Sequence, residues 1–117
     1  MNVQYSFRQE TAGPNLQGFA TRCLQYGLGR FARDIREISV VFEDCNGEKG
    51  GIDKRCRAEV QLVRGRRLRA VVIDSTCESA VHRATSRLRR QLQNAVGERN
   101  QNHDRVGLRA KHAQLSR

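Results

Sequence analysis

The sequence contains no tryptophan, only six other aromatic residues (four Phe and two Tyr), and no long hydrophobic run. A core built from this chain must therefore be mainly aliphatic. A transmembrane helix is excluded because none of its segments approaches about 20 apolar residues. Residues 1–8 have neither the apolar run of a signal peptide nor the Arg/Ser-rich pattern of a transit peptide, so we expect a soluble, cytoplasmic protein.

The residue patterns of common catalytic and metal sites are also missing. The four cysteines are separated by 21, 10 and 20 residues and form no C-x-x-C pair, so we expect thiols and no structural zinc. The three histidines are scattered, and the glycine-rich segment 46–53 lacks the G-x-x-x-x-G-K-[ST] order of a phosphate cradle. Asp44 and Asp53 bracket that segment, but a metal site would need further carboxylates. The sequence therefore predicts no enzyme activity, no cofactor and no bound metal.

Positive charge is abundant and unevenly placed. The chain has 117 residues, which is the size of one small domain, and a net charge of +10 with a pI of about 10.7. Residues 1–53 hold six Lys/Arg and seven Asp/Glu, a balance of −1, whereas residues 54–117 hold sixteen and five, a balance of +11. An excess of this size predicts a nucleic acid or another anionic surface as partner.

The most informative segment is 77–95. Apolar residues three or four positions apart form one helical stripe there: Cys77, Ala80, Val81, Ala84, Leu88, Leu92 and Ala95. Arg83, Arg87 and Arg90 recur at the same period beside the stripe. Because the guanidinium fork binds phosphate bidentately, this row favours a polynucleotide backbone as ligand. The alternative is a solvated basic face that serves solubility alone.

Hydrophobic periodicity predicts the order of the elements. Alternating apolar and polar residues predict strands at 2–7, 38–42, 55–62 and 68–73. The apolar spacing of a helix extends over residues 16–33, and Gly27 and Gly29 weaken this helix where it crosses the sheet closely. A second helix starts after Ser75, an N-cap with Glu78 in a capping box, and runs to about Val96, where Gly97 is placed to stop it.

This order, β-α-β-β-β-α, predicts an α+β fold. The first two strands should be parallel and the others antiparallel, in a four-stranded mixed sheet with both helices packed on one face. This is a two-layer sandwich similar to a double-stranded-RNA-binding domain (dsRBD-like). We assign residues 1–97 to this domain and residues 98–117, which are polar and basic, to a flexible C-terminal tail.

The arginines of the two helices should lie side by side on the exposed side of the helical layer. The first helix would present Arg22, Arg30 and Arg33 beside Arg83, Arg87 and Arg90 of the second, and this surface could follow a phosphate backbone. For Arg22 and Arg33, a solvated helix exterior is the competing interpretation. A further cluster at the 64–69 hairpin either contacts RNA or protects an exposed strand edge from aggregation.

Three segments carry a family resemblance. GGIDKRCRAEV at 50–60 resembles the motif GG-x-DK-x-C, and SAVHRATSRLRRQL at 79–92 is similar to A-[IV]-x-x-A-x-x-[KR]-L-x-R-x-L. Leu28-Gly-Arg-Phe31, followed by Ile35 and by ISVVF at 38–42, looks like the helix-to-strand passage of the same proteins. Together, over about residues 2–96, these segments resemble the hibernation promoting factor / ribosome-associated inhibitor A family, also called sigma-54 modulation proteins.

The resemblance implies a non-enzymatic protein that binds 16S rRNA of the 30S or 70S ribosome, occupies the mRNA and tRNA channel and stores ribosomes under stress or in stationary phase. It implies rRNA contacts for Arg87, Arg90 and Arg30, and Lys54 matches the lysine of the third-strand motif. To these the charge pattern adds Arg83 and Arg22. We expect a monomer that needs no membrane and no small-molecule substrate.

Some features depart from the family pattern, and they leave alternatives open. Asn94 stands where a further basic residue is common, and the segment after Gly97 is basic, with five Lys/Arg and two Asp/Glu. Whether the protein promotes or prevents ribosome dimers is therefore open. A general double-stranded-RNA-binding module and an adaptor for an acidic protein surface remain alternative functions.

Overall fold

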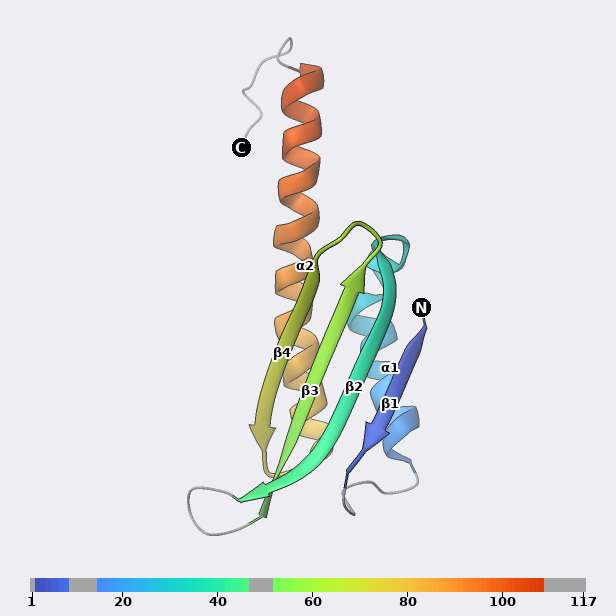
Figure 1. Ribbon diagram of the computed structural model, residues 1–117, viewed down its shortest axis with the longest axis vertical. Helices are drawn as coiled ribbons and strands as arrows, with labels where there is room; N and C mark the ends of the chain where they lie inside the picture. The colour runs from blue at the N-terminus through green and yellow to red at the C-terminus, as the bar shows by residue number, and fades with distance from the viewer. Residues whose placement is uncertain (1, 9–14, 47–51, 109–117) are drawn as a thin grey trace.

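The computed structural model describes residues 2–8, 15–46 and 52–108. It contains four strands, two α-helices and one 3-10 helix (Figure 1). In chain order these are β1 (Val3–Phe7), α1 (Leu16–Leu28), the 3-10 helix η1 (Gly29–Asp34), β2 (Ile35–Asn46), β3 (Ile52–Leu62), β4 (Arg67–Asp74) and α2 (Cys77–Leu108). The predicted order of strands and helices is confirmed.

The four strands form one mixed sheet in the order β1-β2-β3-β4. β1 pairs with β2 in parallel, with Tyr5 opposite Val40, and the two later pairs are antiparallel. Gly65, whose positive φ of 79° suits glycine, lies in the tight turn between β3 and β4. β1 and β4 are therefore the two open edges of the sheet.

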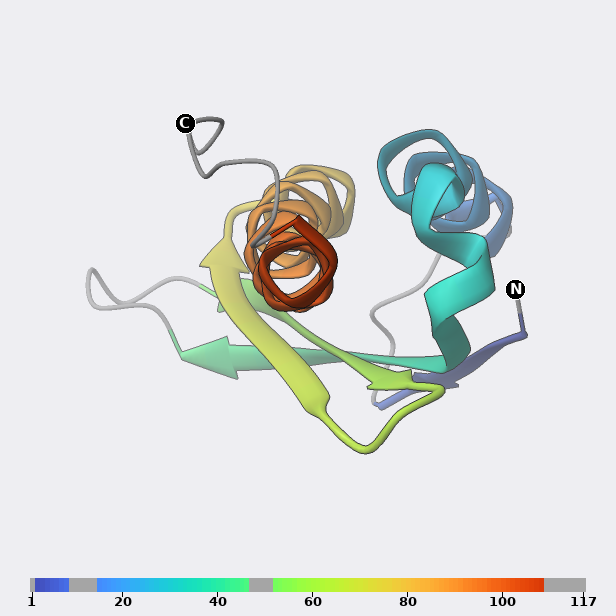
Figure 2. The same ribbon diagram turned by 90° about the horizontal axis from the view of Figure 1, so that it is seen from above.

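Both helices cover the same face of the sheet, as predicted (Figure 2). Period-two alternation sends Ile38, Val40 and Phe42 of β2, and the matching residues of β3 and β4, toward the helices, where they are buried. The two α-helices contribute aliphatic side chains and one cysteine to this core, and none of these residues is aromatic: Leu16, Ala20, Leu24, Leu28, Cys77, Ala80, Val81, Ala84, Leu88 and Leu92. The stripe predicted for the second helix is thus the core face of α2, with Ala95 packed at its margin.

The first helical segment differs from its predicted form in two respects. The α-helical part ends at Leu28, and residues up to Asp34 continue as a 3-10 helix instead of an α-helix to Arg33. Gly27 approaches α2 and not the sheet: a Cβ atom added to it would lie 2.5 Å from the Thr85 methyl carbon Cγ2. Glycine therefore permits the close approach of the two helices.

Both predicted ends of α2 need correction. Thr76 caps the helix, because its hydroxyl oxygen accepts a hydrogen bond from the Ser79 amide at 3.1 Å, whereas the Ser75 amide bonds to Asp74. The helix also continues past Gly97 to Leu108 and projects beyond the sheet (Figure 1). A single glycine costs a helix only about 1 kcal/mol, and the neighbouring Glu, Arg and Gln residues favour helix. The division of the chain at residue 97 remains a prediction.

Candidate RNA-binding surface

One side of α2 is joined to the open edge of β4. The Arg87 guanidinium donates a hydrogen bond to the Val71 carbonyl at 3.0 Å, and the Gln91 amide donates one to the Arg69 carbonyl at 2.9 Å. These carbonyls belong to the edge strand and face away from β3, so they have no partner within the sheet. One helical turn earlier, Arg83 reaches the same strand. This row of side chains therefore satisfies and shields an exposed edge.

Arg83 is held by a carboxylate at the end of β4. Its guanidinium lies 3.2 Å from Asp74 Oδ2, which also accepts a hydrogen bond from the Ser79 hydroxyl at 2.7 Å. The hydrogen bond from Ser79, with those from the Ser75 amide and Arg83, lowers the pKa of Asp74 to about 2. Arg83 is therefore tied to the end of β4 by an ion pair.

Two arginines of the next turn have no such partner. Arg89 and Arg90 are exposed, and within the described part of the chain neither makes a hydrogen bond or an ion pair. Successive residues of an α-helix are about 100° apart, so the two point in different directions. Arg89 faces α1, whereas Arg90 lies on the outer face of α2, on the side nearer Arg83 and Arg87.

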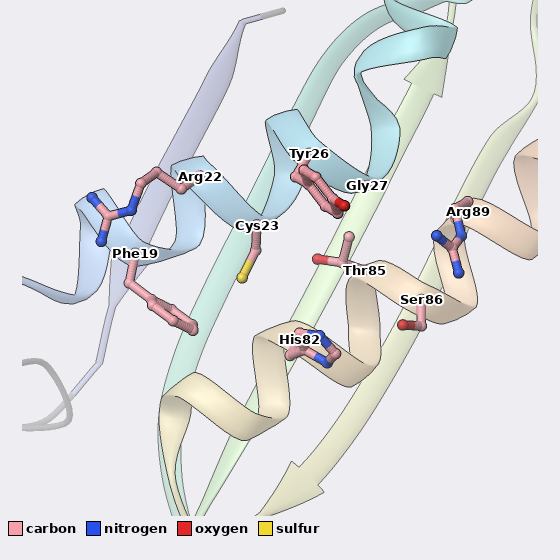
Figure 3. Close-up of a pocket in the computed structure, with 9 residues that line it drawn as sticks. All are labelled: Phe19, Arg22, Cys23, Tyr26, Gly27, His82, Thr85, Ser86 and Arg89. Carbon is pink, nitrogen blue, oxygen red and sulfur yellow. The ribbon is translucent and has the colours of Figure 1, made fainter.

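Between α1 and α2 lies an open groove with a cavity volume of about 470 Å³ (Figure 3). Phe19, Cys23 and Thr85 provide its partly or fully buried walls. Nine residues line it, none of them acidic: Phe19, Arg22, Cys23, Tyr26, Gly27, His82, Thr85, Ser86 and Arg89. Burial raises the pKa of the Cys23 thiol, so that group stays neutral. The groove is thus a depression with positive charge at its rim.

The first-helix arginines of the predicted site lie in three different settings. Arg22 is exposed and lines the groove. Arg30 lies in the 3-10 helix with its guanidinium 5.1 Å from the centre of the Phe31 ring, a cation–π contact that leaves its charge exposed. Arg33 is exposed in the same segment.

Lys54 lies away from these arginines. It is on the helix-facing side of β3, opposite Asp74 on β4, where α2 begins. Its ammonium group lies 2.7 Å from Asp44 Oδ1 on β2, and this hydrogen bond raises the pKa of Lys54. The predicted basic surface is therefore divided: Arg83, Arg87 and Lys54 bond to other parts of the fold. Arg22 and Arg90 have no hydrogen-bond or ion-pair partner among the described residues, and Arg30 contacts only the ring of its neighbour Phe31 there.

The other face of the sheet carries arginines that are mostly ion-paired. Arg55 pairs with Glu43, and Arg67 and Arg69 both pair with Glu59, at 3.4 and 2.8 Å. Two members of the predicted hairpin cluster thus join a cross-strand network, while Arg64 is exposed in the turn. On the helical layer, by contrast, Arg22, Arg89 and Arg90 have no ion-pair partner among the described residues.

Sequence reasoning missed Arg89, Tyr26 and His82 as groove residues. The row at Arg83, Arg87 and Arg90, expected beside the first-helix arginines, lies on the β4 side and the outer face of α2. A helical projection separates Arg89 from that row. Only the packing of α2 on the sheet shows which side meets α1.

Two features are absent from the described residues, a cluster of metal-ligating side chains and a membrane-spanning helix. No three His, Cys, Asp or Glu side chains gather there in a group that could hold a metal ion. No helix among the described ranges combines the length and apolarity needed to cross a membrane.

Comparisons with known proteins give a consistent result. A search of curated proteins found no match. Among solved structures, the N-terminal domain of Thermus thermophilus Protein Y is similar, with a TM-score of 0.65 and 21% identity over 80% of this chain and 98% of that one. A ribosomal subunit interface protein from Coxiella burnetii is similar with a TM-score of 0.69 and 20% identity, over 83% and 99%.

Both structural similarities support the fold that the element order predicted. The sequence itself matches a family model over residues 3–100, which includes every strand, α1 and the packed part of α2. That model is described as sigma 54 modulation protein / S30EA ribosomal protein. The resemblance noted in the three sequence segments is therefore confirmed, and this chain belongs to the sigma 54 modulation protein / S30EA ribosomal protein family.

Proposed function

We propose that this protein binds the small ribosomal subunit through 16S rRNA, occupies the channel used by mRNA and tRNA, and keeps ribosomes inactive under stress or in stationary phase. The observation that carries the proposal is the unpaired positive charge of the helical layer. Arg22, Arg89 and Arg90 project from it without partners among the described residues, in a chain that belongs to a ribosomal protein family. The similar fold of a ribosomal subunit interface protein from Coxiella burnetii supports the same proposal.

Occupancy is sufficient for this function, so no bond has to be made or broken. A guanidinium that has no carboxylate partner can replace the counterions of a phosphate backbone, whereas an ion-paired one must first lose its partner. The ribosome also sets the location, which is the cytoplasm. We expect the protein to act as a monomer.

Sedimentation of cell extract on a sucrose gradient tests the proposal. We expect the protein to travel with 30S or 70S particles at low salt and to dissociate as salt is raised. Protein found only at the top of the gradient at low salt would contradict ribosome binding. Free duplex RNA bound as tightly as ribosomes would favour the general double-stranded-RNA-binding function.

A matched pair of double variants tests the surface. Arg89→Gln with Arg90→Gln removes two charges from the helical layer, and Arg67→Gln with Arg69→Gln removes two from the opposite face of the sheet. We expect the first to weaken ribosome binding at least tenfold and to reduce the slope of log affinity against log salt by about 1.5, at about 0.7–0.9 per lost phosphate contact. The second should change binding less than threefold. Equal losses would show that net charge, and not this surface, determines binding.

A further inference from the structure

We propose that the groove between α1 and α2 receives one unpaired base of single-stranded RNA, which stacks on Tyr26 while Arg22 and Arg89 contact the flanking phosphates. This inference rests on the proposed function and specifies how the same surface recognises RNA. It distinguishes a surface that only tracks a charged backbone from one that requires a splayed-out base.

The shape of the groove fits a planar ring. Its volume of about 470 Å³ lies within the roughly 300–1,000 Å³ of small-molecule sites. Gly27 and Thr85, which meet in close contact, both line the groove, and Tyr26 projects from α1 beside Gly27 (Figure 3). Phe19 and Cys23 provide apolar wall farther along α1. An aromatic ring thus stands at the rim of a partly apolar depression.

Among the large hydrophobic side chains that the structure describes, Tyr26 has by far the highest exposed fraction, 94%. Its ring contributes almost nothing to the core, so packing does not explain its position. Stacking of a base on such a ring is compatible with any nucleotide sequence because every base has a π-face. The hydroxyl group keeps the exposed ring compatible with water.

The charges around the groove match RNA. Arg22 and Arg89 lie on opposite helices at its rim, and neither has a hydrogen-bond or ion-pair partner in the described ranges. The carboxylates that neutralise other arginines, such as Asp74 and Glu59, do not line the groove. An acidic protein surface would complement the arginines but would not account for the exposed Tyr26 ring or for the groove beside it.

A base-deletion experiment tests the proposal directly. The full chain is titrated with a short single-stranded RNA and with an abasic strand of the same length and charge. We expect wild-type protein to prefer the strand with bases about tenfold, and the Tyr26→Ala variant to bind both strands alike. Tyr26→Phe should behave as wild type. Equal affinity of wild-type protein for both strands would overturn the proposal.

Because the chain contains no tryptophan, the Tyr26→Trp variant carries a single fluorescent reporter at the groove. We expect its emission to be quenched by the single-stranded RNA and not by the abasic strand. Quenching by a free mononucleotide at the same concentration as by RNA would assign the groove to a soluble nucleotide and overturn the RNA inference. No quenching by either would also overturn it.

Ribosome binding separates the two proposals. If the Tyr26→Ala variant binds ribosomes as wild type does while the Arg89→Gln, Arg90→Gln double variant does not, the proposal of a base-binding groove is wrong and the proposed function stands. If wild-type protein does not travel with ribosomes, the proposed function fails, and the abasic comparison still decides the groove. Tyr26→Ala should also lower affinity without changing the salt slope, since it removes no charge.

Discussion

The two sides of α2 show how one arginine-rich helix performs two different tasks. On the side toward β4, Arg83, Arg87 and Gln91 bond to the edge strand. On the side toward α1, Arg89 has no partner among the described residues and joins Arg22 and Tyr26 around a groove. Arginine on the first side completes the fold, whereas on the second it remains available for a ligand. Residue type and helical spacing alone do not distinguish the two roles.

The largest expected effect concerns the close contact between Gly27 of α1 and Thr85 of α2. Gly27→Val should destabilise the protein by about 1–3 kcal/mol, because the added carbons overlap the Thr85 side chain. Chemical denaturation measures this change. Gly29→Ala is the control, since nothing lies within 4 Å of a Cβ there and its φ of −59° is helical, and it should be neutral or slightly stabilising.

A double-mutant cycle tests whether the lost stability comes from the contact between Gly27 and Thr85. Thr85→Ser removes the methyl carbon that the new side chain meets, so it should restore part of the stability lost in Gly27→Ala. Strict additivity of the two changes would show that the helices do not meet at this point.

The comparison of the two sides is tested most directly by two neighbouring arginines. Arg87→Met removes a hydrogen bond to an edge carbonyl and should lower the free energy of unfolding by about 0.5–1 kcal/mol, because a net hydrogen bond is worth that much. Arg89→Met, on the side toward α1, removes no hydrogen bond or ion pair among the described residues, so it should leave stability within about 0.5 kcal/mol of wild type.

For ribosome binding we expect the opposite ranking. Arg89→Met should weaken binding more than Arg87→Met, since of the two only Arg89 has no hydrogen-bond or ion-pair partner among the described residues. If both variants lose the same stability and the same affinity, the division of α2 into a structural and a ligand-facing side is wrong.

The smallest effect is expected at Asp74 and only in acid. Its pKa is lowered from 3.8 to about 2 in the folded protein, so its carboxylate stabilises the fold above about pH 4, and this contribution is lost as the pH falls from about 4 to 2. Wild-type stability should therefore decline more steeply over that interval than the stability of Asp74→Asn. Parallel curves would show that the contacts of Asp74 with Ser79 and Arg83 do not stabilise the fold.

Much of the fold was accessible from periodicity alone. Alternation at Ile38, Val40 and Phe42 and the stripe ending at Leu92 both predicted core faces that the structure confirms. Helix ends were less accessible. Serine and threonine both favour the N-cap position, so the sequence does not distinguish Ser75 from Thr76. Only the hydrogen bond from the Ser79 amide shows that Thr76 caps the helix. Gly97 is a reasonable stop signal that neighbouring helix formers overcome.

By itself the sequence determined the order of the elements, the family and the expectation of an anionic partner, because these follow from local period, motif and net charge. Only the tertiary structure decided which arginines are committed to the fold and which are available. A helical period of 3.6 residues places side chains around an axis, but it does not say whether a strand edge or another helix lies opposite each side. That depends on how α2 packs, with β4 against Arg87 and α1 against Thr85.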